Sequence, residues 1–110
     1  MDNFKSLIAS HPFVLVDFYA DWCEPCKMLD QILQEVSNHF GDDLKIVKID
    51  IDKNPEIAKA YGFKSVPVLH LYKDSDLIWK YKGFMNTYDT IKLLEMYKGL
   101  KSFDEFKNGN

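Results

Sequence analysis

The chain has 110 residues, of which 46% are hydrophobic and 28% charged, and its formal net charge is −3. This length and composition predict one globular domain with a buried core and exclude a disordered chain. All 14 basic residues are lysines, and an acidic chain without arginine lacks the fork that binds phosphate or guanine bidentately. Nucleic acid is therefore not an expected partner.

The sequence contains no apolar run of the roughly 18 residues that a membrane-spanning helix needs. The segment Met1 to Lys5 has no basic stretch followed by a long apolar one, as a signal peptide would. We therefore expect a cytoplasmic protein that does not bind membranes. An exported protein whose signal peptide had been removed would have the same sequence.

Hydrophobic periodicity predicts the secondary structure in chain order. Helices are predicted over 2–10, 24–40, 55–61 and 87–98, and strands over 13–19, 45–51, 66–73 and 77–82. A tight turn is predicted between the last two strands, which would then form a hairpin. Ser102 and Glu105 have the spacing of a capping box, which predicts a short turn over 103–107.

The order of these elements predicts an α/β fold with a central mixed sheet of about four strands flanked by helices. Right-handed crossovers would make the strands that they connect parallel, with the antiparallel hairpin at one side. We expect one domain over residues 1–100, followed by a short C-terminal tail over 101–110.

Cys23 and Cys26 are the only two cysteines, and they stand where a predicted strand gives way to a predicted helix. The first turn of a helix has unpaired N–H groups and the positive end of the helix dipole, which favour a thiolate. Such a pair can perform dithiol–disulfide exchange or share a metal. The three histidines are neither clustered nor at ligand spacing, so we expect no metal site.

The segment DFYADWCEPCKM (17–28), followed by Val66-Pro67, resembles the thioredoxin family. The resemblance implies a thioredoxin fold and a protein disulfide oxidoreductase, with a redox-active disulfide between Cys23 and Cys26 and no bound cofactor. The family's usual first strand is missing from this chain. An edge of the sheet would then be exposed, or covered by the N-terminal or C-terminal segment.

The resemblance also implies catalytic roles. Cys23 would be the attacking thiolate and Cys26 the resolving thiol. Asp17 would lie beneath Cys26 and act as its general base, with Lys48 as the neighbour that tunes it. From the residues alone, Asp17 is either a buried carboxylate with a raised pKa or an acid at a solvent-facing point of the strand.

Substrate-binding residues follow from the same resemblance. Thioredoxins have a cis proline at the position of Pro67, and the backbone of Val66 would pair with an extended substrate segment. Gly83 would let the substrate backbone approach closely. Trp22, Val66 and Phe84 would form an exposed apolar rim that accepts substrate chain. Core packing is the alternative for each of them, and for Phe84 the two interpretations are evenly supported.

Glu24 and Pro25 separate the cysteines, where this family sets its redox poise. Glu24 replaces the usual glycine, and its carboxylate suits the helix dipole but lies beside the nucleophile. The direction of the reaction therefore stays open at this point.

The expected partners are protein substrates that contain disulfides and a thioredoxin reductase as electron donor, with the chain acting as a monomer. Three alternatives remain. The chain could be a thiol oxidase or disulfide isomerase of the same fold. It could be a thioredoxin-fold binding module in which the cysteines are dispensable. It could also share a metal or iron–sulfur site across a dimer.

Overall fold

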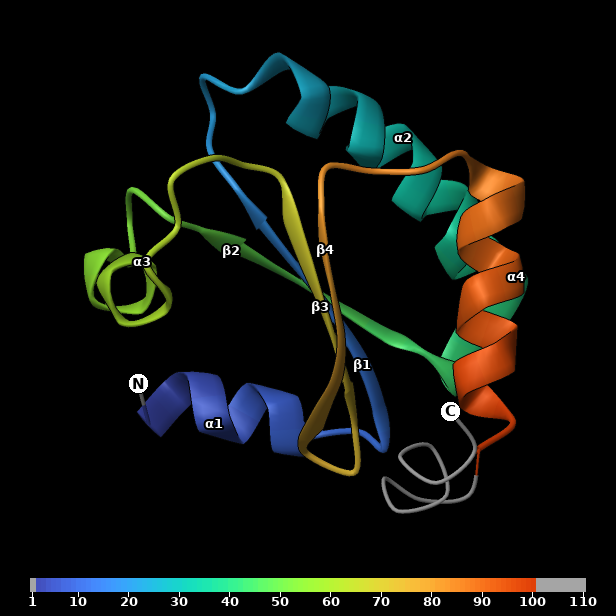
Figure 1. The fold of residues 1–110 in the computed structure, drawn as a ribbon. Coiled ribbons are helices and arrows are strands. Elements are labelled where there is room, and N and C mark those ends of the chain that lie inside the picture. The colour runs from blue at the N-terminus through green and yellow to red at the C-terminus, as the bar shows by residue number, and fades with distance from the viewer. Residues whose placement is uncertain (1, 101–110) are drawn as a thin grey trace.

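The computed structural model describes residues 2–100 (Figure 1). The predicted helices are present as α1 (Asp2–Ala9), α2 (Glu24–Phe40), α3 (Pro55–Tyr61) and α4 (Thr87–Lys98). The predicted strands are present as β1 (Phe13–Tyr19), β2 (Lys45–Asp50), β3 (Val68–Lys73) and β4 (Asp76–Lys82). A single 3₁₀ turn, η1 (Gly41–Asp43), joins α2 to β2 in this part of the chain. The tail over 101–110 and the turn expected over 103–107 lie outside the described residues.

The described strands form one mixed sheet of four strands, as the sequence predicts, and their order in the sheet is β2-β1-β3-β4. The connection through α2 gives the expected parallel pairing of β1 and β2, whereas β3 is antiparallel to both β1 and β4. The parallel pairing expected of the second connection, through α3, is therefore wrong. Strand β3 begins two residues later than predicted, at Val68, because the Val66-Pro67 bond is cis and proline has no N–H for the ladder. The predicted α/β class is confirmed.

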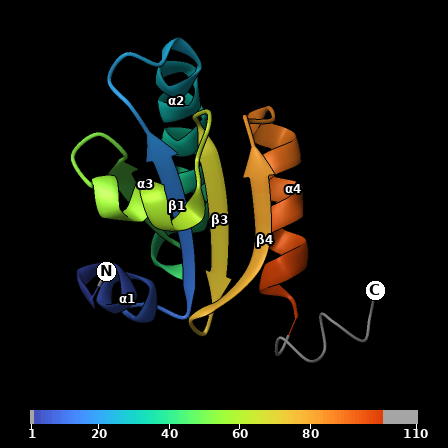
Figure 2. The same ribbon diagram turned by 60° about the vertical axis from the view of Figure 1, so that its left-hand side comes forward.

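Two pairs of helices cover the two faces of the sheet (Figures 1 and 2). Helices α2 and α4 cover one face, where Leu33 and Leu94 pack against Leu15 and Leu71. On the other face, the buried Phe4 of α1 shares a second cluster with residues of β1, β2 and α3. Alternate residues of β1 point to opposite faces, which puts Asp17 on the same face as Leu15, beneath α2.

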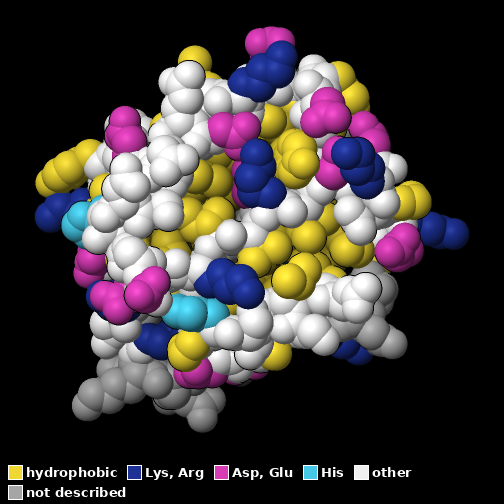
Figure 3. Space-filling model, turned by 180° about the vertical axis from the view of Figure 1, so that it is seen from behind, with side chains coloured by type: hydrophobic (Ala, Val, Ile, Leu, Met, Phe, Trp, Pro, Cys, Tyr) yellow, Lys and Arg dark blue, Asp and Glu magenta, His cyan; other side chains and the backbone are white. Residues whose placement is uncertain are grey.

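Strand β2 forms one edge of the sheet. Among residues 2–100, no strand pairs with the outer side of β2, and α1 covers a face of the sheet and not this edge. Helix α1 therefore does not cover this edge, as the N-terminal segment was expected to if the edge were not exposed. In the rear view of Figure 3, hydrophobic side chains are visible over the middle of the molecule, with Lys, Asp and Glu side chains among and around them.

The hairpin between β3 and β4 has a two-residue turn. Lys73 pairs with Asp76, and the residues between them, Asp74 and Ser75, have φ values of 50° and 72°. Two residues with positive φ indicate a type I′ turn, which matches the twist of the flanking strands. Neither residue is a glycine, so each adopts a backbone conformation that its Cβ disfavours.

Candidate active site

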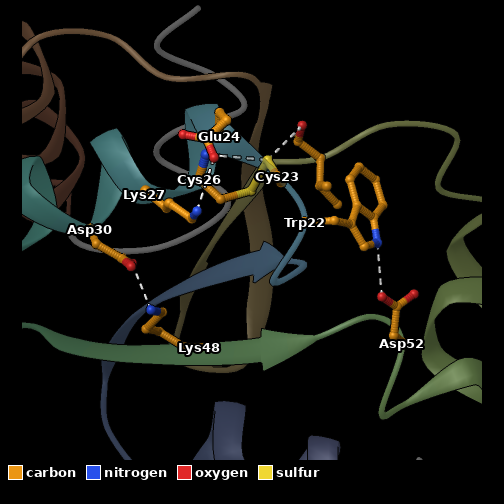
Figure 4. The surroundings of a disulfide bond; sticks show 9 residues. Trp22, Cys23, Glu24, Cys26, Lys27, Asp30, Lys48 and Asp52 are labelled. Carbon is orange, nitrogen blue, oxygen red and sulfur yellow. Dashed lines mark hydrogen bonds and ion pairs between the residues drawn. A yellow bond between two sulfur atoms is a disulfide. The ribbon is translucent and has the colours of Figure 1, made fainter.

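The two cysteines form a disulfide at the N-terminus of α2 (Figure 4). Cys23 is the N-cap residue, and its Sγ accepts a hydrogen bond of 3.2 Å from the backbone N–H of Cys26. Pro25 fits in the first turn because the N–H that it lacks would have no intrahelical partner there. Both cysteines are 3% exposed, so their exposure does not differ. The hydrogen bond to Cys23 is of the kind that favours a thiolate once the disulfide is reduced.

The loop before β3 lies against the disulfide. The carbonyl oxygen of Val66 is 3.5 Å from Cys23 Sγ, and Val66 packs against the small cluster of Cys23, Cys26 and Ala20. The Val66-Pro67 peptide bond is cis, as the resemblance to thioredoxins implies. Val66 and Pro67 are therefore brought to the cysteine pair from a segment 40 or so positions away in the chain.

Gly83 follows β4 and is tied to this loop. Its N–H donates a hydrogen bond of 2.8 Å to the carbonyl oxygen of Pro67. Its φ is +94°, a conformation that side chains disfavour, and no atom outside its chain neighbours lies within 4 Å of where a Cβ would be. Glycine therefore fits the backbone here and leaves open space beside the loop.

Trp22 lies at the surface next to the disulfide. Its side chain is 67% exposed, and its Nε1 donates a hydrogen bond of 2.9 Å to Oδ2 of Asp52 (Figure 4). The indole is thus held in place while most of it stays accessible. Phe84, by contrast, is partly buried and packs against the main core between the sheet and helices α2 and α4, so core packing accounts for much of its surface.

Asp52 was missed in the sequence analysis. The signal for it is its position just after β2, because β1 and β2 are parallel and their carboxyl ends meet at one edge of the sheet. The buried Asp50 shapes this loop, since its Oδ1 accepts hydrogen bonds from the backbone N–H groups of Asp52 and Lys53. The parallel pairing of β1 and β2 therefore explains why Asp52 lies close to Trp22.

Glu24 turns its carboxylate to Lys27, one turn further along α2. The two charged groups are 2.9 Å apart, and both side chains are largely exposed. The lysine offsets the negative charge that the sequence analysis placed beside Cys23.

Asp17 is a buried carboxyl group without a hydrogen-bond partner. It is 0% exposed, and neither oxygen has a partner in the structure. Burial raises the pKa of Asp17 from its ordinary value of 3.8 to about 7, with Lys48 lowering it and Asp30 adding to the rise. The buried-acid interpretation is confirmed, and the solvent-facing one is wrong.

Lys48 lies next to Asp17 but does not bond to it. Its Nζ is 2.6 Å from Oδ1 of Asp30 on α2 (Figure 4) and 4.5 Å from the centre of the Tyr19 ring. The sequence analysis did not include Asp30. Its signal is the spacing of four residues from Cys26, which puts both side chains on the same side of α2.

His70 is a core residue, as expected of a histidine in the middle of a strand. It is 2% exposed, its Nδ1 is 3.3 Å from the hydroxyl of Tyr72, and its ring meets that of Phe18 edge-on. Burial lowers the pKa of His70 to about 4, so the imidazole is neutral at pH 7. Within residues 2–100, no group of three or more His, Cys, Asp or Glu side chains is placed to hold a metal ion.

No helix in the described part of the chain is both long enough and apolar enough to cross a membrane.

Comparisons with known proteins agree with this geometry. The family model described as Thioredoxin matches residues 1–96. The thioredoxin of Bacillus subtilis is 46% identical over 83 residues, which cover 76% of this chain and 80% of that protein. A thioredoxin-like protein of Synechocystis is 40% identical over 96 residues, covering 86% of this chain and 91% of the relative.

Solved structures give the same result. A mutant thioredoxin from Halobacterium salinarum has a TM-score of 0.80 at 32% identity, covering 93% of this chain and 88% of that one. Oxidised mitochondrial thioredoxin 3 from Saccharomyces cerevisiae has a TM-score of 0.75 at 35% identity, covering 86% and 88% of the two chains. With its cysteine pair at the start of α2 and its four-stranded mixed sheet, this chain belongs to the thioredoxin family and is a thiol–disulfide oxidoreductase.

Proposed function

We propose that the chain acts as a reductase of protein disulfides, with Cys23 as the nucleophile and Cys26 as the resolving thiol. The observation that carries this assignment is the hydrogen bond from the N–H of Cys26 to Cys23 Sγ at the helix N-terminus. It favours the thiolate on Cys23 over that on Cys26, and the thiolate is the attacking species.

The proposed reaction has two exchange steps. The Cys23 thiolate attacks one sulfur of the substrate disulfide, so that a mixed disulfide forms and the other substrate sulfur leaves as a thiolate. Cys26 then loses its proton to Asp17 and attacks Cys23 Sγ, forming the Cys23–Cys26 disulfide and releasing the second substrate thiolate. The substrate gains two electrons, and the protein dithiol supplies them.

Asp17 supports this scheme as the base. A carboxyl group whose pKa is about 7 is partly ionised at neutral pH and accepts and returns a proton easily. It lies on the face of the sheet that α2 covers, and the thioredoxin resemblance implies that the base lies beneath Cys26 of that helix. Lys48 is the proposed tuning residue, because its charge lowers the pKa of Asp17.

The proposed substrate surface surrounds the disulfide. Substrate backbone would pair with Val66, whose peptide bond to Pro67 is cis, and Gly83 would leave room for it. Trp22 supplies exposed apolar surface that accepts the side chains of flexible substrate segments. Phe84 has a smaller part, because it packs partly against the core. The lysine-paired Glu24 and the following Pro25 are the proposed residues for tuning the redox poise.

The proposed electron donor is a thioredoxin reductase, since members of this family act on disulfide substrates together with such a reductase. No cofactor needs to be bound, because the cysteine pair itself carries the electrons. The proposed working form is a monomer in the cytoplasm, where conditions keep thiols reduced. Recovery of the protein from an exported fraction with its cysteines oxidised would contradict this compartment.

The roles of the two cysteines are tested by trapping the mixed disulfide. A Cys26→Ser variant is mixed with a protein substrate such as insulin, and the adduct is digested and mapped by mass spectrometry. We expect a stable adduct through Cys23 with Cys26→Ser, and no adduct with Cys23→Ser. An adduct that forms as readily on Cys26 in the Cys23→Ser variant would contradict the assignment.

The same pair of variants separates a reductase from a binding module. Insulin reduction by the wild-type protein, with a thioredoxin reductase and NADPH as the electron source, should be lost in Cys23→Ser. A binding module would keep its biological activity in that variant. The matched control is Ser37→Ala on the same helix, which leaves the cysteines unchanged.

A further inference from the structure

We propose that Asp30 is a positioning residue of the thiol–disulfide reaction, because it holds the ammonium group of Lys48 and so keeps Asp17 free to accept a proton from Cys26. The inference rests on the proposed role of Asp17 as base. It concerns a third residue that does not touch the reacting sulfur atoms. Asp30 lies on α2, Lys48 on β2 and Asp17 on β1.

Lys48 has two carboxylates within reach. Asp17 and Lys48 are register partners in the parallel pairing of β1 and β2, so their side chains leave the same face of the sheet side by side. Asp30 reaches down to this face from α2 above it. The lysine side chain is long and flexible, and it bonds to Asp30 at 2.6 Å, while both oxygens of Asp17 are left without a partner.

The difference in burial between Asp30 and Asp17 explains why Lys48 bonds to Asp30. The side chains of Asp30 and Lys48 are 46% and 43% exposed, whereas Asp17 is completely buried. A lysine that turned inward to Asp17 would lose its water, and the attraction between buried charges often fails to repay that cost. Asp30 offers the same lysine a charged partner at the surface.

Asp30 then acts on Asp17 in two ways, and both keep the pKa of Asp17 high. Its own negative charge raises the pKa of Asp17, and its bond to Lys48 limits how closely the lysine can approach and lower that pKa. The charged groups that act on Asp17 among the described residues are these two, from α2 and β2. On the other side, β3 presents the apolar Leu69 as the register partner of Asp17.

The proton balance shows why this arrangement matters. When Cys26 attacks Cys23 Sγ, its proton passes to the Asp17 carboxylate, the bond between Cys23 and the substrate sulfur breaks, and the electron pair leaves with the substrate thiolate. If Lys48 bonded to Asp17, the carboxylate would be stabilised as an anion and would be a weaker base. Asp30 prevents this.

The test is an Asp30→Asn variant, which keeps the shape of the side chain and removes its charge. The pKa of Asp17 is measured in the oxidised protein by NMR titration of its side-chain carboxyl carbon. We expect it to fall by about one to two pH units. The matched control is Asp43→Asn, which removes a carboxylate from another surface lysine pair, 3.0 Å from Lys98, and should leave the pKa of Asp17 unchanged.

A Lys48→Gln background tests the route through the lysine. There, Asp30→Asn should shift the pKa of Asp17 by less than it does in the wild-type background, because only the direct effect of the Asp30 charge remains. An equal shift in both backgrounds, or no shift in either, would overturn the inference. These results would leave the role of Asp17 as base untouched.

The kinetic arm tests the function on which the inference rests. The rate at which a mixed disulfide with Cys23 is resolved is followed against pH, and its apparent pKa should move to lower pH in Asp30→Asn together with the NMR value. If the NMR value moves and the rate profile does not, Asp17 is not the base, and the positioning role of Asp30 fails with it. Circular dichroism of both variants checks that the fold is kept.

Discussion

Replacing Asp17 with asparagine should stabilise the folded, oxidised protein at neutral and alkaline pH. Asp17 is fully buried and both of its oxygens lack partners, so its ionised form is costly inside the protein. Asparagine has nearly the same shape and carries no charge at any pH. The two proteins should therefore differ little when Asp17 is protonated and strongly when it is ionised.

The magnitude follows from the shift in the pKa of Asp17 from 3.8 to about 7, which corresponds to about 4 kcal/mol. The folded state holds the proton more tightly than the unfolded state. Below about pH 4 the carboxyl group is protonated in both states, and the contribution of Asp17 to stability is fully present. Between the two pKa values the unfolded chain has lost the proton while the folded protein keeps it, so ionisation favours the unfolded state. The contribution is lost as the pH rises to about 7 and stays lost above that.

The assay is urea denaturation of the oxidised wild-type protein and of Asp17→Asn at several values of pH between 4 and 8. The difference between the two proteins is the useful quantity, because His70 acts in the opposite direction over part of this range. We expect the advantage of Asp17→Asn to grow by about 4 kcal/mol from pH 4 to pH 8. Two stability curves that stay parallel would refute the argument that Asp17 is buried without a hydrogen-bond partner.

Three further substitutions test the fold. Ser75→Gly should stabilise the protein by about 1 kcal/mol in urea denaturation, because Ser75 has a φ of 72° in the hairpin turn that glycine adopts without strain; a loss of stability would contradict the turn assignment. The pKa of His70 is lowered to about 4 in the folded state, so His70→Leu should be more stable relative to wild type as the pH falls from about 6.5 to 4, and a pH-independent difference would count against a buried neutral imidazole. Leu94→Ala should cost about 2 to 5 kcal/mol of unfolding free energy, because Leu94 is 0% exposed between α4 and the sheet; a smaller effect would mean that this part of the core is loosely packed.

Much of the fold can be predicted because the local sequence signals agree with one another. The apolar run 13–19 becomes β1 with the predicted bounds, and Gly41 ends α2 where the sequence indicates. The predicted start of β3 at Val66 is two residues early, because the apolar pattern includes Val66 and Pro67 whereas the paired ladder begins at Val68 and proline has no N–H to donate to it. Periodicity describes side chains, and it cannot reveal which backbone groups are paired.

Part of the candidate site can likewise be predicted from local sequence, and part of it depends on tertiary packing. The positions of Cys23 and Cys26 can be predicted because both lie where one strand gives way to one helix, and the local sequence shows this junction. The pairs Lys48–Asp30 and Trp22–Asp52 join elements far apart in the chain, and they depend on how α2 lies over the sheet and where β2 ends. Such pairs follow from tertiary packing, and a single sequence carries only weak signals for them.

The reduction potential of the Cys23–Cys26 couple tests the central claim most directly. The oxidised protein is equilibrated in dithiol buffers of defined potential, and the fraction reduced is followed by the fluorescence of Trp22, which lies beside the disulfide. Because Lys27 offsets the charge of Glu24, we expect a value close to the −270 mV or so that is typical of thioredoxin. A value near the −180 mV or so of protein disulfide isomerase would contradict the account and indicate an isomerase or oxidase.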